Sequence, residues 1–429
     1  MTTQAAETSN PSPSEETSKL FDTWLAANGP VALRLRQRLL PVEADENGPG
    51  VIFPPTYADI GYNIDTLADG TRVATIDTVG SQANRLEPIF KSTGKNHEDE
   101  ELNPLASLVP QIEIVLHKKG NKKHAEAHGD GDAGEHIEKR SLLDLAHRSA
   151  DAVVLASPTL AGEVAKAFEA LRHKGNAAPL CTIAPTSLVF GVWDSRGGTG
   201  EKRPRLVRSI IRAWEVDVLH SAAQFNSVWK ALSKEQQTAL ETEAKAKRIK
   251  LSAKGFADAP ATFRKVSEKA SKYMHEFQDG TANPERRVLG GVLAKGDIER
   301  DVTVNLVALR GLRGKDATET QQVQKYLLSL ALIAATADLE LFLREGCLLR
   351  YAGDDAWTAV PRRGDPTPVS LPLHAELVKF AATAAAPFKE KWPKGENGAP
   401  LALEHEFNLA EAKKLLAKKD DTAPADAQG

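Results

Sequence analysis

The chain has 429 residues and a formal net charge of −3, with 41% hydrophobic and 26% charged residues. A chain of this length can bury a substantial core and can form two or three domains, and the composition is that of an ordinary globular protein. The nearly neutral charge excludes a protein that coats nucleic acid with a uniformly basic surface, so any nucleic-acid-binding face must be local.

The N-terminal residues do not predict a targeting signal. Residues 1–18 are rich in Thr, Ser, Glu and Pro and contain no apolar core segment, which indicates a disordered tail. The longest apolar run extends from Tyr326 towards Leu343, but Asp338 and Glu340 interrupt it, and it falls short of the ~20 residues that a membrane helix needs. We therefore expect a cytoplasmic protein that does not bind membranes.

Helical and strand patterns alternate along the chain. The first predicted helix covers Leu20–Leu40, with leucines on its apolar side and Arg34, Arg36 and Arg38 between them. Strands are predicted at 73–79, 111–116, 181–193, 213–219, 302–310 and 347–351. Further helices are predicted at 82–91, 141–155, 160–173, 321–345, 371–387 and 404–418. This alternation favours an α+β fold with helices on one face of a sheet, of which the ferredoxin-like βαββαβ arrangement is one example.

The predicted strand at 73–79 leads directly into a polar helix start. Ser81 is a candidate N-cap, and Gln82, Asn84 and Arg85 would follow in the first turn. Exposed helix N-termini attract anions through free N–H groups, so these side chains could contact sugars, phosphates or bases. The alternative is an ordinary capped helix whose polar side chains satisfy the local backbone.

Two segments have the composition of insertions. Residues 117–140 contain almost no apolar side chains, so we expect a mobile, charged loop. His117, His124, His128 and His136 lie in it, but a flexible loop cannot hold metal ligands in fixed geometry, and no metal site is predicted. Residues 221–280 are rich in Lys, Glu, Ala and Gln and are interpreted as a helical subdomain. Its expected helix anchors are Trp229, Leu232, Leu240, Phe263 and Phe277.

A basic cluster follows an apolar run and a glycine loop. Residues 186–193 suit a buried strand, and Gly197, Gly198 and Gly200 allow the backbone to approach a ligand closely. The cations of this region are Arg196, Lys202, Arg203, Arg205, Arg208 and Arg212. A glycine loop with clustered cations favours a phosphate backbone as ligand, although a solvated surface turn is the alternative.

Cys181 and Cys347 lie in apolar runs. They are expected to be reduced core residues, because two isolated cysteines indicate neither a disulfide framework nor a zinc site.

Several blocks resemble one known family. Asp77-Thr-Val-Gly-Ser-Gln-Ala-Asn-Arg-Leu-Glu87 and Pro185-Thr-Ser-Leu-Val-Phe-Gly-Val-Trp-Asp-Ser195 are similar to signature blocks of a CRISPR-associated backbone subunit. Further similar blocks are Phe53-Pro-Pro-Thr-Tyr57, Ser141–Asp151 and Thr303–Arg313. On these residues the chain resembles the Cas seven-type protein of the type I-U (I-G) Cascade, in the RAMP superfamily.

The resemblance implies an RNA-recognition-motif-like (RRM-like) sheet with large insertions. We expect a core formed by 19–220 and 281–360, a helical insertion at 221–280, and a C-terminal helical extension with an acidic tail at 361–429. A projecting thumb segment contacts the neighbouring copy in such proteins, and the loop at 117–140 is our candidate for it.

The function that the resemblance implies is non-catalytic. Several copies would polymerise along a guide RNA, protect it and present it for pairing with invading DNA, together with other Cascade subunits and a helicase-nuclease. No cofactor is expected. The predicted RNA-contacting residues are Ser81, Gln82, Asn84, Arg85, Arg196, Lys202, Arg203, Arg205, Arg208 and Arg212.

Two other classes of function remain open. A RAMP-type endoribonuclease would cut guide precursors or target RNA, with His147 and Asp194 as candidate catalytic residues. We expect Asp194 to form a turn and His147 to lie on a helix facing the sheet. No nucleotide-binding phosphate loop, nucleophile elbow or zinc-protease helix occurs in the sequence. The third class is a protein scaffold without a nucleic-acid role.

Overall fold

The computed structural model describes most of the chain. It covers residues 13–44, 50–57, 60–92, 103–118, 136–193, 202–220, 228–249, 251–254, 256, 274–277, 285–353, 355–392 and 402–417. The predicted glycine loop with Arg196 and Asp194, the histidines His124 and His128, and the anchor Phe263 lie outside the described residues. So do the first twelve residues of the predicted tail, whereas residues 13–18 belong to helix α1 (Pro13–Leu25).

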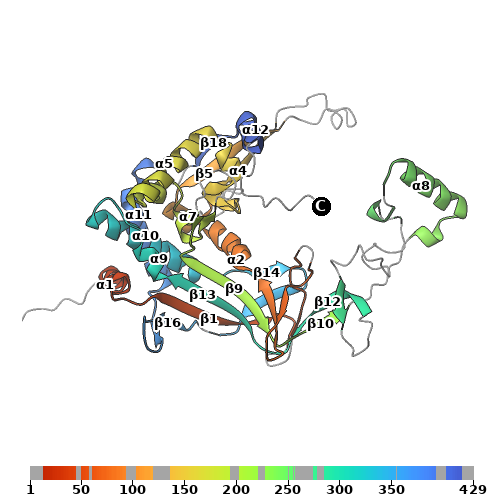
Figure 1. Cartoon of the computed structure of the whole chain (residues 1–429), viewed down its shortest axis with the longest axis horizontal. Helices are drawn as coiled ribbons and strands as arrows, with labels where there is room; N and C mark the ends of the chain where they lie inside the picture. The colour runs from red at the N-terminus through yellow and green to blue at the C-terminus, as the bar shows by residue number, and fades with distance from the viewer. Residues whose placement is uncertain are drawn as a thin grey trace, which may run out of the picture.

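A curled antiparallel sheet forms the centre of the molecule (Figure 1). Seven of its strands follow the order β14-β15-β1-β13-β9-β4-β3, and β16 and β17 join beside β1. In chain order these strands are β1 (Ala32–Pro41), β3 (Ile64–Thr66), β4 (Arg72–Asp77), β9 (Val207–Trp214), β13 (Ile298–Asn305), β14 (Leu341–Arg344), β15 (Cys347–Tyr351), β16 (Trp357–Val360) and β17 (Thr367–Pro368).

The connections within this sheet confirm the predicted α+β class. Helix α2 (Val79–Leu86) lies between β1 and β9 in the chain, and α10 (Ala317–Ala335) lies between β13 and β15. The elements β1, α2, β9, β13, α10 and β15 thus run in βαββαβ order. Their four strands are arranged β15-β1-β13-β9 and all pair antiparallel, which is the ferredoxin-like arrangement expected of a RAMP protein.

The prediction of a helix over Leu20–Leu40 was wrong in its second half, which forms β1. Leu33, Leu35 and Leu39 are at most 1% exposed, whereas the arginines between them alternate to the other face. This period of two is the pattern of a strand with one buried face.

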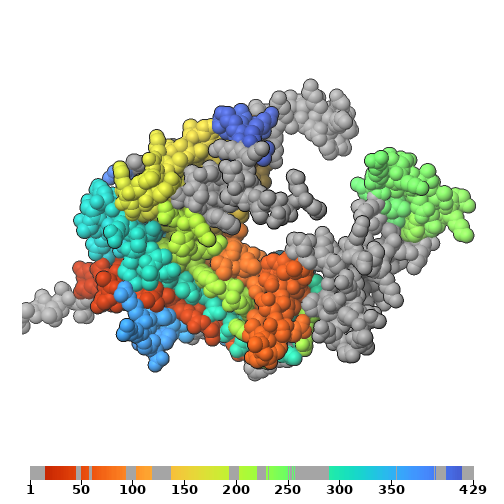
Figure 2. Space-filling view, viewed as in Figure 1, coloured from red at the N-terminus to blue at the C-terminus, as the bar shows by residue number. Residues whose placement is uncertain are grey.

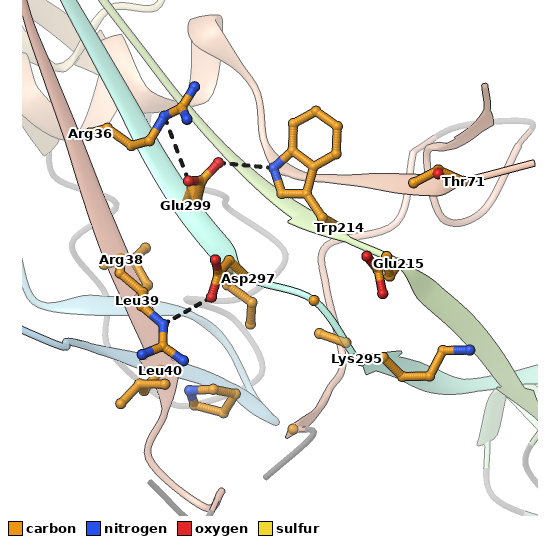
Figure 3. A pocket seen from close by; sticks show the side chains of 15 residues that line it. Arg36, Arg38, Leu39, Leu40, Thr71, Trp214, Glu215, Lys295, Asp297 and Glu299 are labelled. Atoms are coloured by element: carbon orange, nitrogen blue, oxygen red, sulfur yellow. Dashed lines mark hydrogen bonds and ion pairs between the residues drawn. The ribbon is translucent and has the colours of Figure 1, made fainter. Parts of the chain in front are cut away.

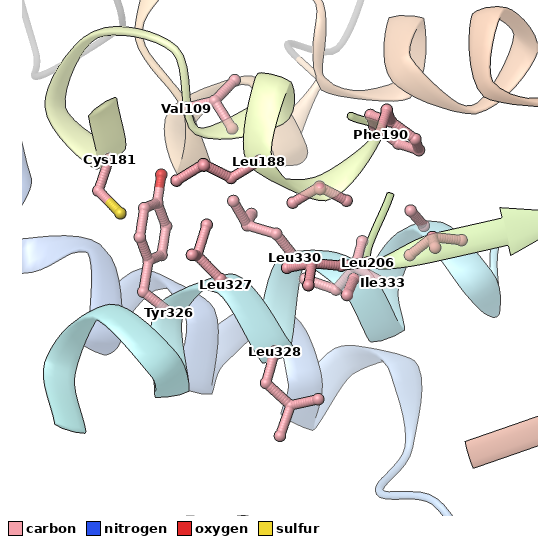
Figure 4. Close-up of a cluster of buried hydrophobic side chains, with 14 of the residues drawn as sticks. Val109, Cys181, Leu188, Phe190, Leu206, Tyr326, Leu327, Leu328, Leu330 and Ile333 are labelled. Atoms are coloured by element: carbon pink, nitrogen blue, oxygen red, sulfur yellow. The ribbon is translucent and has the colours of Figure 1, made fainter. Parts of the chain in front are cut away.

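A layer of helices covers the face of the sheet that carries Leu33 and Leu35. Helix α10 is buried almost continuously from Tyr326 to Ala335, and the hydroxyl of its Tyr326 donates to the carbonyl of Leu108 at 2.7 Å. Figure 4 shows Leu327, Leu330 and Ile333 of α10 pointing towards Leu188 and its neighbours. The layer also includes α5 (Pro158–Lys174), α6 (Ala178–Ile183), α7 (Pro185–Val189), α9 (Leu306–Arg310) and α11 (His374–Ala385). None of the described helices is long and apolar enough to cross a membrane.

The apolar run at 181–193 was wrongly predicted as a strand. It forms α6 and α7, and only Val192–Trp193 pairs as β7 with Lys202–Arg203 of β8. Pro185 stands at the first position of α7, where proline is favoured because no helical hydrogen bond is lost. Both cysteines are buried and free, as predicted, although Cys181 lies on a helix.

The predicted helix at 141–155 was also wrong over most of its length. Two 3-10 turns, η3 (Leu142–Asp144) and η4 (Arg148–Ala150), precede a single helical turn, α4 (Ala152–Leu155). The predicted strand at 302–310 ends at Asn305, after which α9 begins.

The hairpin between β9 and β13 continues beyond the sheet as a ribbon. Strand β10 (Val216–His220) pairs with β12 (Glu285–Ala294), which also pairs with β2 (Gly50–Ile52) and β11 (Met274–Phe277). The segment predicted as a helical subdomain is described only in part. It contains α8 (Lys234–Ala246), but its end is the strand β11. Helix α8 stands apart from the main body (Figure 2), and none of its described residues is buried.

The loop predicted at 117–140 begins and ends in strands. Strand β5 (Gln111–Lys118) pairs with β6 (His136–Ser141), and residues 119–135 lie outside the described part. On the other side of β5, β18 (Ala402–Glu406) pairs parallel, followed by α12 (Leu409–Ala417). The helix predicted at 404–418 thus begins as strand β18 and is helical only from Leu409, and β18 and α12 pack on β5, α4 and α5.

Candidate nucleic-acid interface

Helix α2 carries the first block of polar residues, and it starts earlier than predicted. Its N-cap is Thr78, whose hydroxyl oxygen accepts from the Ser81 N–H at 3.2 Å, so Ser81 is not the cap. The Ser81 hydroxyl lies 3.0 Å from that of Thr78. The helix beginning at Val79 places Gln82 on the buried side and Asn84 on the exposed side.

Gln82 is fully enclosed and belongs to a buried polar band. Its side-chain amide donates to Asp77 Oδ2 at 2.7 Å, and its carbonyl oxygen accepts from the Ser209 hydroxyl at 2.7 Å. The same oxygen accepts from Arg300 Nε at 3.3 Å. Because every polar atom of the Gln82 side chain is used inside the protein, we interpret Gln82 as a positioning residue that fixes α2 to β9 and β13, rather than as a direct contact.

Arg300 is the centre of this band and is 0% exposed. Its guanidinium donates to Gln37 Oε1 at 2.7 Å and to Ser209 Oγ at 3.1 Å. Burial lowers the pKa of Arg300, because the charged form has lost its water shell. Gln37, Arg300 and Ser209 lie in neighbouring strands on the helix-covered face, between the two hydrophobic clusters of the sheet.

Part of the Arg85 guanidinium also interacts with the buried polar band. Its Nε lies 3.1 Å from Asp77 Oδ2, and its Nη2 donates to the carbonyl of Leu343. Burial raises the pKa of the Asp77 carboxyl, and the hydrogen bond from Gln82 and the charge of Arg85 oppose that rise. About a third of the Arg85 side chain remains exposed, at 33%.

The other end of α2 adjoins a buried ion pair. Arg148 Nε lies 2.6 Å from Glu87 Oε2, and the two side chains are 4% and 1% exposed. Arg148 adopts φ +54°, an unusual conformation for a residue other than glycine, and it places the guanidinium over the Phe190 ring at 5.5 Å. Burial raises the pKa of Glu87 to about 7 despite the charge of Arg148.

Arg148 joins the three signature blocks at one place. Its Nη1 donates to the carbonyl of Gly191 at 3.3 Å, and its Nη2 lies 3.5 Å from Asn84 Oδ1. The hydroxyls of Ser149 and Ser187 hydrogen-bond at 2.7 Å. The blocks 77–87 and 141–151 and the described residues 185–193 of the third block therefore converge on one part of the fold, with Asn84 at its surface. The sequence analysis identified these blocks but did not predict that Arg148 and Glu87 form an ion pair. A buried ion pair between residues distant in the chain leaves no local sequence pattern.

Arg205 lies beside the same ion pair. Gly191 has φ +78°, and a Cβ there would come within 2.8 Å of Arg205 Cγ and 3.0 Å of the Arg203 carbonyl oxygen. Burial, followed by repulsion from Arg148, lowers the pKa of Arg205. We call Ser81, Asn84, Lys202, Arg203 and Arg205 together the α2 surface. In Figure 2 the orange residues, which include α2, lie against the yellow-green residues, which include α7 and β9.

The predicted basic cluster is divided between two faces of the sheet. Arg208 and Arg212 alternate with buried residues of β9 and point away from the helices. They share that side with Arg34, Arg36 and Arg38 of β1, and the register pairs both strands with β13. We call this side the open face. The open face also carries Glu299 and Asp301, which form ion pairs with the arginines of β1.

The remaining candidates are dispersed. His147 is exposed in a turn and does not face the sheet from a helix as predicted. His117 lies on β5 with its Nε2 2.9 Å from Glu406 Oε2. Among the described residues, no group of three His, Cys, Asp or Glu side chains is placed to hold a metal ion.

Comparison with known proteins supports the resemblance. No curated protein matches the chain. Residues 33–218, which span β1 to β10 and include the convergent blocks, match the family described as CRISPR-associated protein GSU0053. This part of the chain is therefore similar to a CRISPR-associated protein family, which is consistent with a Cas seven-type subunit.

Proposed function

We propose that this protein is a non-catalytic backbone subunit that binds guide RNA through the α2 surface. The convergence of the signature blocks on Arg148 is the observation that carries the proposal, because it holds exposed Asn84 and the cations beside Arg205 in one place. The guide would be protected along its length and presented for pairing with invading DNA.

The character of the surface suits binding without sequence preference. Guide RNAs of unrelated sequence must be accepted, so contacts are made to phosphates and ribose rather than to base edges. Arg203, Arg205 and Lys202 supply charge for phosphates, and Asn84 supplies an amide at the exposed side of α2. The buried band beneath Gln82 keeps this surface rigid.

Native purification with a transcribed CRISPR array tests the proposal. We expect guide-length RNA to co-purify, detected by absorbance and by sequencing of the extracted RNA. Protein without RNA would favour a scaffold role and would contradict the proposal.

A labelled repeat RNA separates the proposal from the endoribonuclease alternative. The subunit should protect the RNA without cutting it. A specific cut that disappears in His147→Ala would replace the proposal by the alternative.

The salt dependence of binding tests the phosphate contacts. Each contact with a single strand contributes about 0.7 to the logarithmic salt slope, so Arg203→Ala with Arg205→Ala should reduce the slope by about 1.4. Arg363→Ala with Lys379→Ala removes the same charge from exposed positions elsewhere and serves as the matched control. An equal reduction in both double variants would show a general charge effect and would exclude a local site.

Assembly on RNA is the second part of the proposal. Free subunits should stay small, and guide RNA should convert them into a long oligomer, because the shared strand overcomes the entropy cost of association. The loop between β5 and β6 is our candidate for reaching the adjacent copy. Excising residues 120–134 should leave binding to short RNA intact but abolish cooperative filling of longer RNA. Stepwise growth of mass in light scattering by the excised protein would exclude this role.

A further inference from the structure

A pocket lies at the end of the open face, where the sheet continues into the β10–β12 ribbon. It has a volume of about 690 Å³, within the usual range for ligand sites. The polar and aromatic side chains that line it come from β1, β9, β13 and the adjoining turns (Figure 3). The principal ones are Arg36, Arg38, Trp214, Lys295, Asp297 and Glu299.

The Trp214 ring is held in a fixed orientation. Its indole N–H donates to Glu299 Oε2 at 3.0 Å, and the other oxygen of Glu299 lies 3.6 Å from Arg36 Nε. Figure 3 shows Arg36 and Trp214 approaching the Glu299 carboxylate from opposite sides. A tryptophan whose polar atom is already satisfied and whose ring lines a pocket offers a flat apolar surface to a planar ligand.

The cations around the pocket can exchange partners. The Arg36 and Arg38 side chains are 52% and 53% exposed, and Arg38 Nε pairs with Asp297 at 2.9 Å. Lys295 is 51% exposed and pairs with Asp217 at 3.0 Å. Exposed ion pairs contribute little to stability, so these cations can turn to an incoming phosphate at low cost.

The carboxylates determine which part of a nucleotide enters. Glu299, Asp297 and Glu215 line the pocket and repel a phosphate group from its interior. A nucleotide would therefore keep its phosphate at the rim, beside the arginines, and place its base inside.

The strand β9 leads to the pocket. Arg208, Arg212 and Trp214 occupy alternate positions of β9, so their side chains stand on the same face. The two arginines of the predicted basic cluster that do not belong to the α2 surface thus form a cationic approach to the tryptophan.

The geometry points to a nucleobase-binding pocket in which one base of a single-stranded nucleic acid stacks on Trp214 while the adjacent backbone follows Arg212 and Arg208. This inference rests on the proposed function as a nucleic-acid-binding subunit and assigns a second contact site to it, on the face of the sheet opposite the α2 surface. The strand is either the guide RNA itself or a displaced DNA strand, which share this chemistry.

Oligonucleotides with one abasic position test the inference. Scanned along a single-stranded RNA, the abasic position should weaken binding by the wild-type protein about tenfold where the missing base is the one that stacks. Trp214→Leu should bind the intact RNA about as weakly and should lose no further affinity with the abasic RNA. Trp214→Phe keeps an aromatic ring and should retain most of the binding. Repeating the scan with DNA on guide-loaded protein identifies which strand enters.

The possible outcomes separate this inference from the proposed function. If the wild-type protein binds no nucleic acid, both the proposed function and this inference are contradicted. If it binds RNA and Trp214→Leu binds with equal affinity and equal sensitivity to the abasic position, the pocket is not a base site, whereas the α2 surface is unaffected. Loss of subunit assembly with normal RNA binding in Trp214→Leu would assign the pocket to a protein partner and overturn the inference. The abasic scan is also carried out with the wild-type protein. It therefore still shows whether one base contributes to binding if Trp214→Leu does not fold.

Discussion

The two faces of the central sheet carry the same residue types in different surroundings. On the helix-covered face, Arg300 is fully buried and donates hydrogen bonds to neutral Gln37, Gln82 and Ser209. On the open face, Arg36 is half exposed and lies 3.3 Å from Asp301. A buried charge is costly unless its hydrogen bonds are made, whereas an exposed ion pair contributes at most about 1 kcal/mol.

This difference separates structural arginines from arginines that are available to a ligand. Arg300 and Arg148 hold α2 and the neighbouring turns in place, and exchanging their partners would break the fold. The open-face arginines can exchange a carboxylate for a phosphate without structural loss. Position in the sheet, rather than residue type, thus decides which of these arginines can exchange their partners.

The largest effect is expected for Arg300→Ala. The substitution removes the donor from three buried acceptors and should reduce the free energy of unfolding by about 3–5 kcal/mol. Urea unfolding of the variant and of Arg38→Ala, a surface control on the adjacent strand, measures it. A loss below 1 kcal/mol would show that the buried band contributes little to stability.

A smaller effect is expected at Gly191, where the backbone approaches Arg205. Gly191→Ala combines strain at φ +78° with a contact of 2.8 Å to Arg205 Cγ and should cost about 2–3 kcal/mol. Gly70→Ala is the matched control, because Gly70 has φ +87° but a Cβ there would meet no atom of the described residues within 4 Å.

The difference between the two glycine variants in thermal unfolding isolates the contacts with Arg205 and with the Arg203 carbonyl oxygen from the strain of a positive φ. Gly191→Ala should also weaken RNA binding, because it displaces Arg205 within the α2 surface. Equal stability losses in the two variants would mean that Arg205 moves freely, and the surface would then not be held as rigidly as proposed.

The sequence predicted the fold better than the site. The strands at 73–79 and 347–351 and the helices at 160–173 and 371–387 were confirmed, because their apolar periods are regular. In β1 the alternation of Leu33 and Leu35 with arginines was present but was read with the wrong period. In 181–193 the run is apolar on all sides, and periodicity cannot distinguish a buried helix from a strand.

The site depends on contacts that no local pattern contains. Gln82 and Arg300 are 218 positions apart in the chain, so the polar residue predicted at a helix start could not be recognised as buried. The division of the basic cluster follows from β9 itself. Arg203 and Arg205 precede the strand, whereas Arg208 and Arg212 alternate within it. Placing this boundary correctly would have predicted the separation.

The buried ion pair of Glu87 predicts a pH dependence. Burial raises the pKa of Glu87 from 4.5 to about 7 in the folded protein, so the folded state binds the proton more tightly than the unfolded state. The contribution of Glu87 to stability is therefore fully present below pH 4.5 and is lost as the pH rises through about 7.

Glu87→Gln keeps the shape and removes this titration. The free energy of unfolding of the wild-type protein, measured relative to that of Glu87→Gln by urea titration, should fall by about 2–3 kcal/mol between pH 4.5 and pH 7. A relative stability that rises over this interval would show that Arg148 outweighs burial and keeps Glu87 ionised.

The smallest effect on stability, and the most direct test of the comparison, is expected on the open face. Arg36→Ala should change the free energy of unfolding by no more than about 0.5 kcal/mol, because the side chain is half exposed and its partners Glu299 and Asp301 remain hydrated. Nucleic-acid affinity should nevertheless fall, since one cation at the rim of the Trp214 pocket is removed.

Asp301→Asn changes the charge in the opposite direction at nearly constant shape. It frees Arg34 and Arg36 from a carboxylate and should raise the affinity at low salt. Filter binding over a range of salt concentrations measures the affinity, and urea unfolding of the same samples measures the stability. If both variants lower affinity in proportion to lost stability, the open-face arginines are structural, and the distinction between the two faces does not hold.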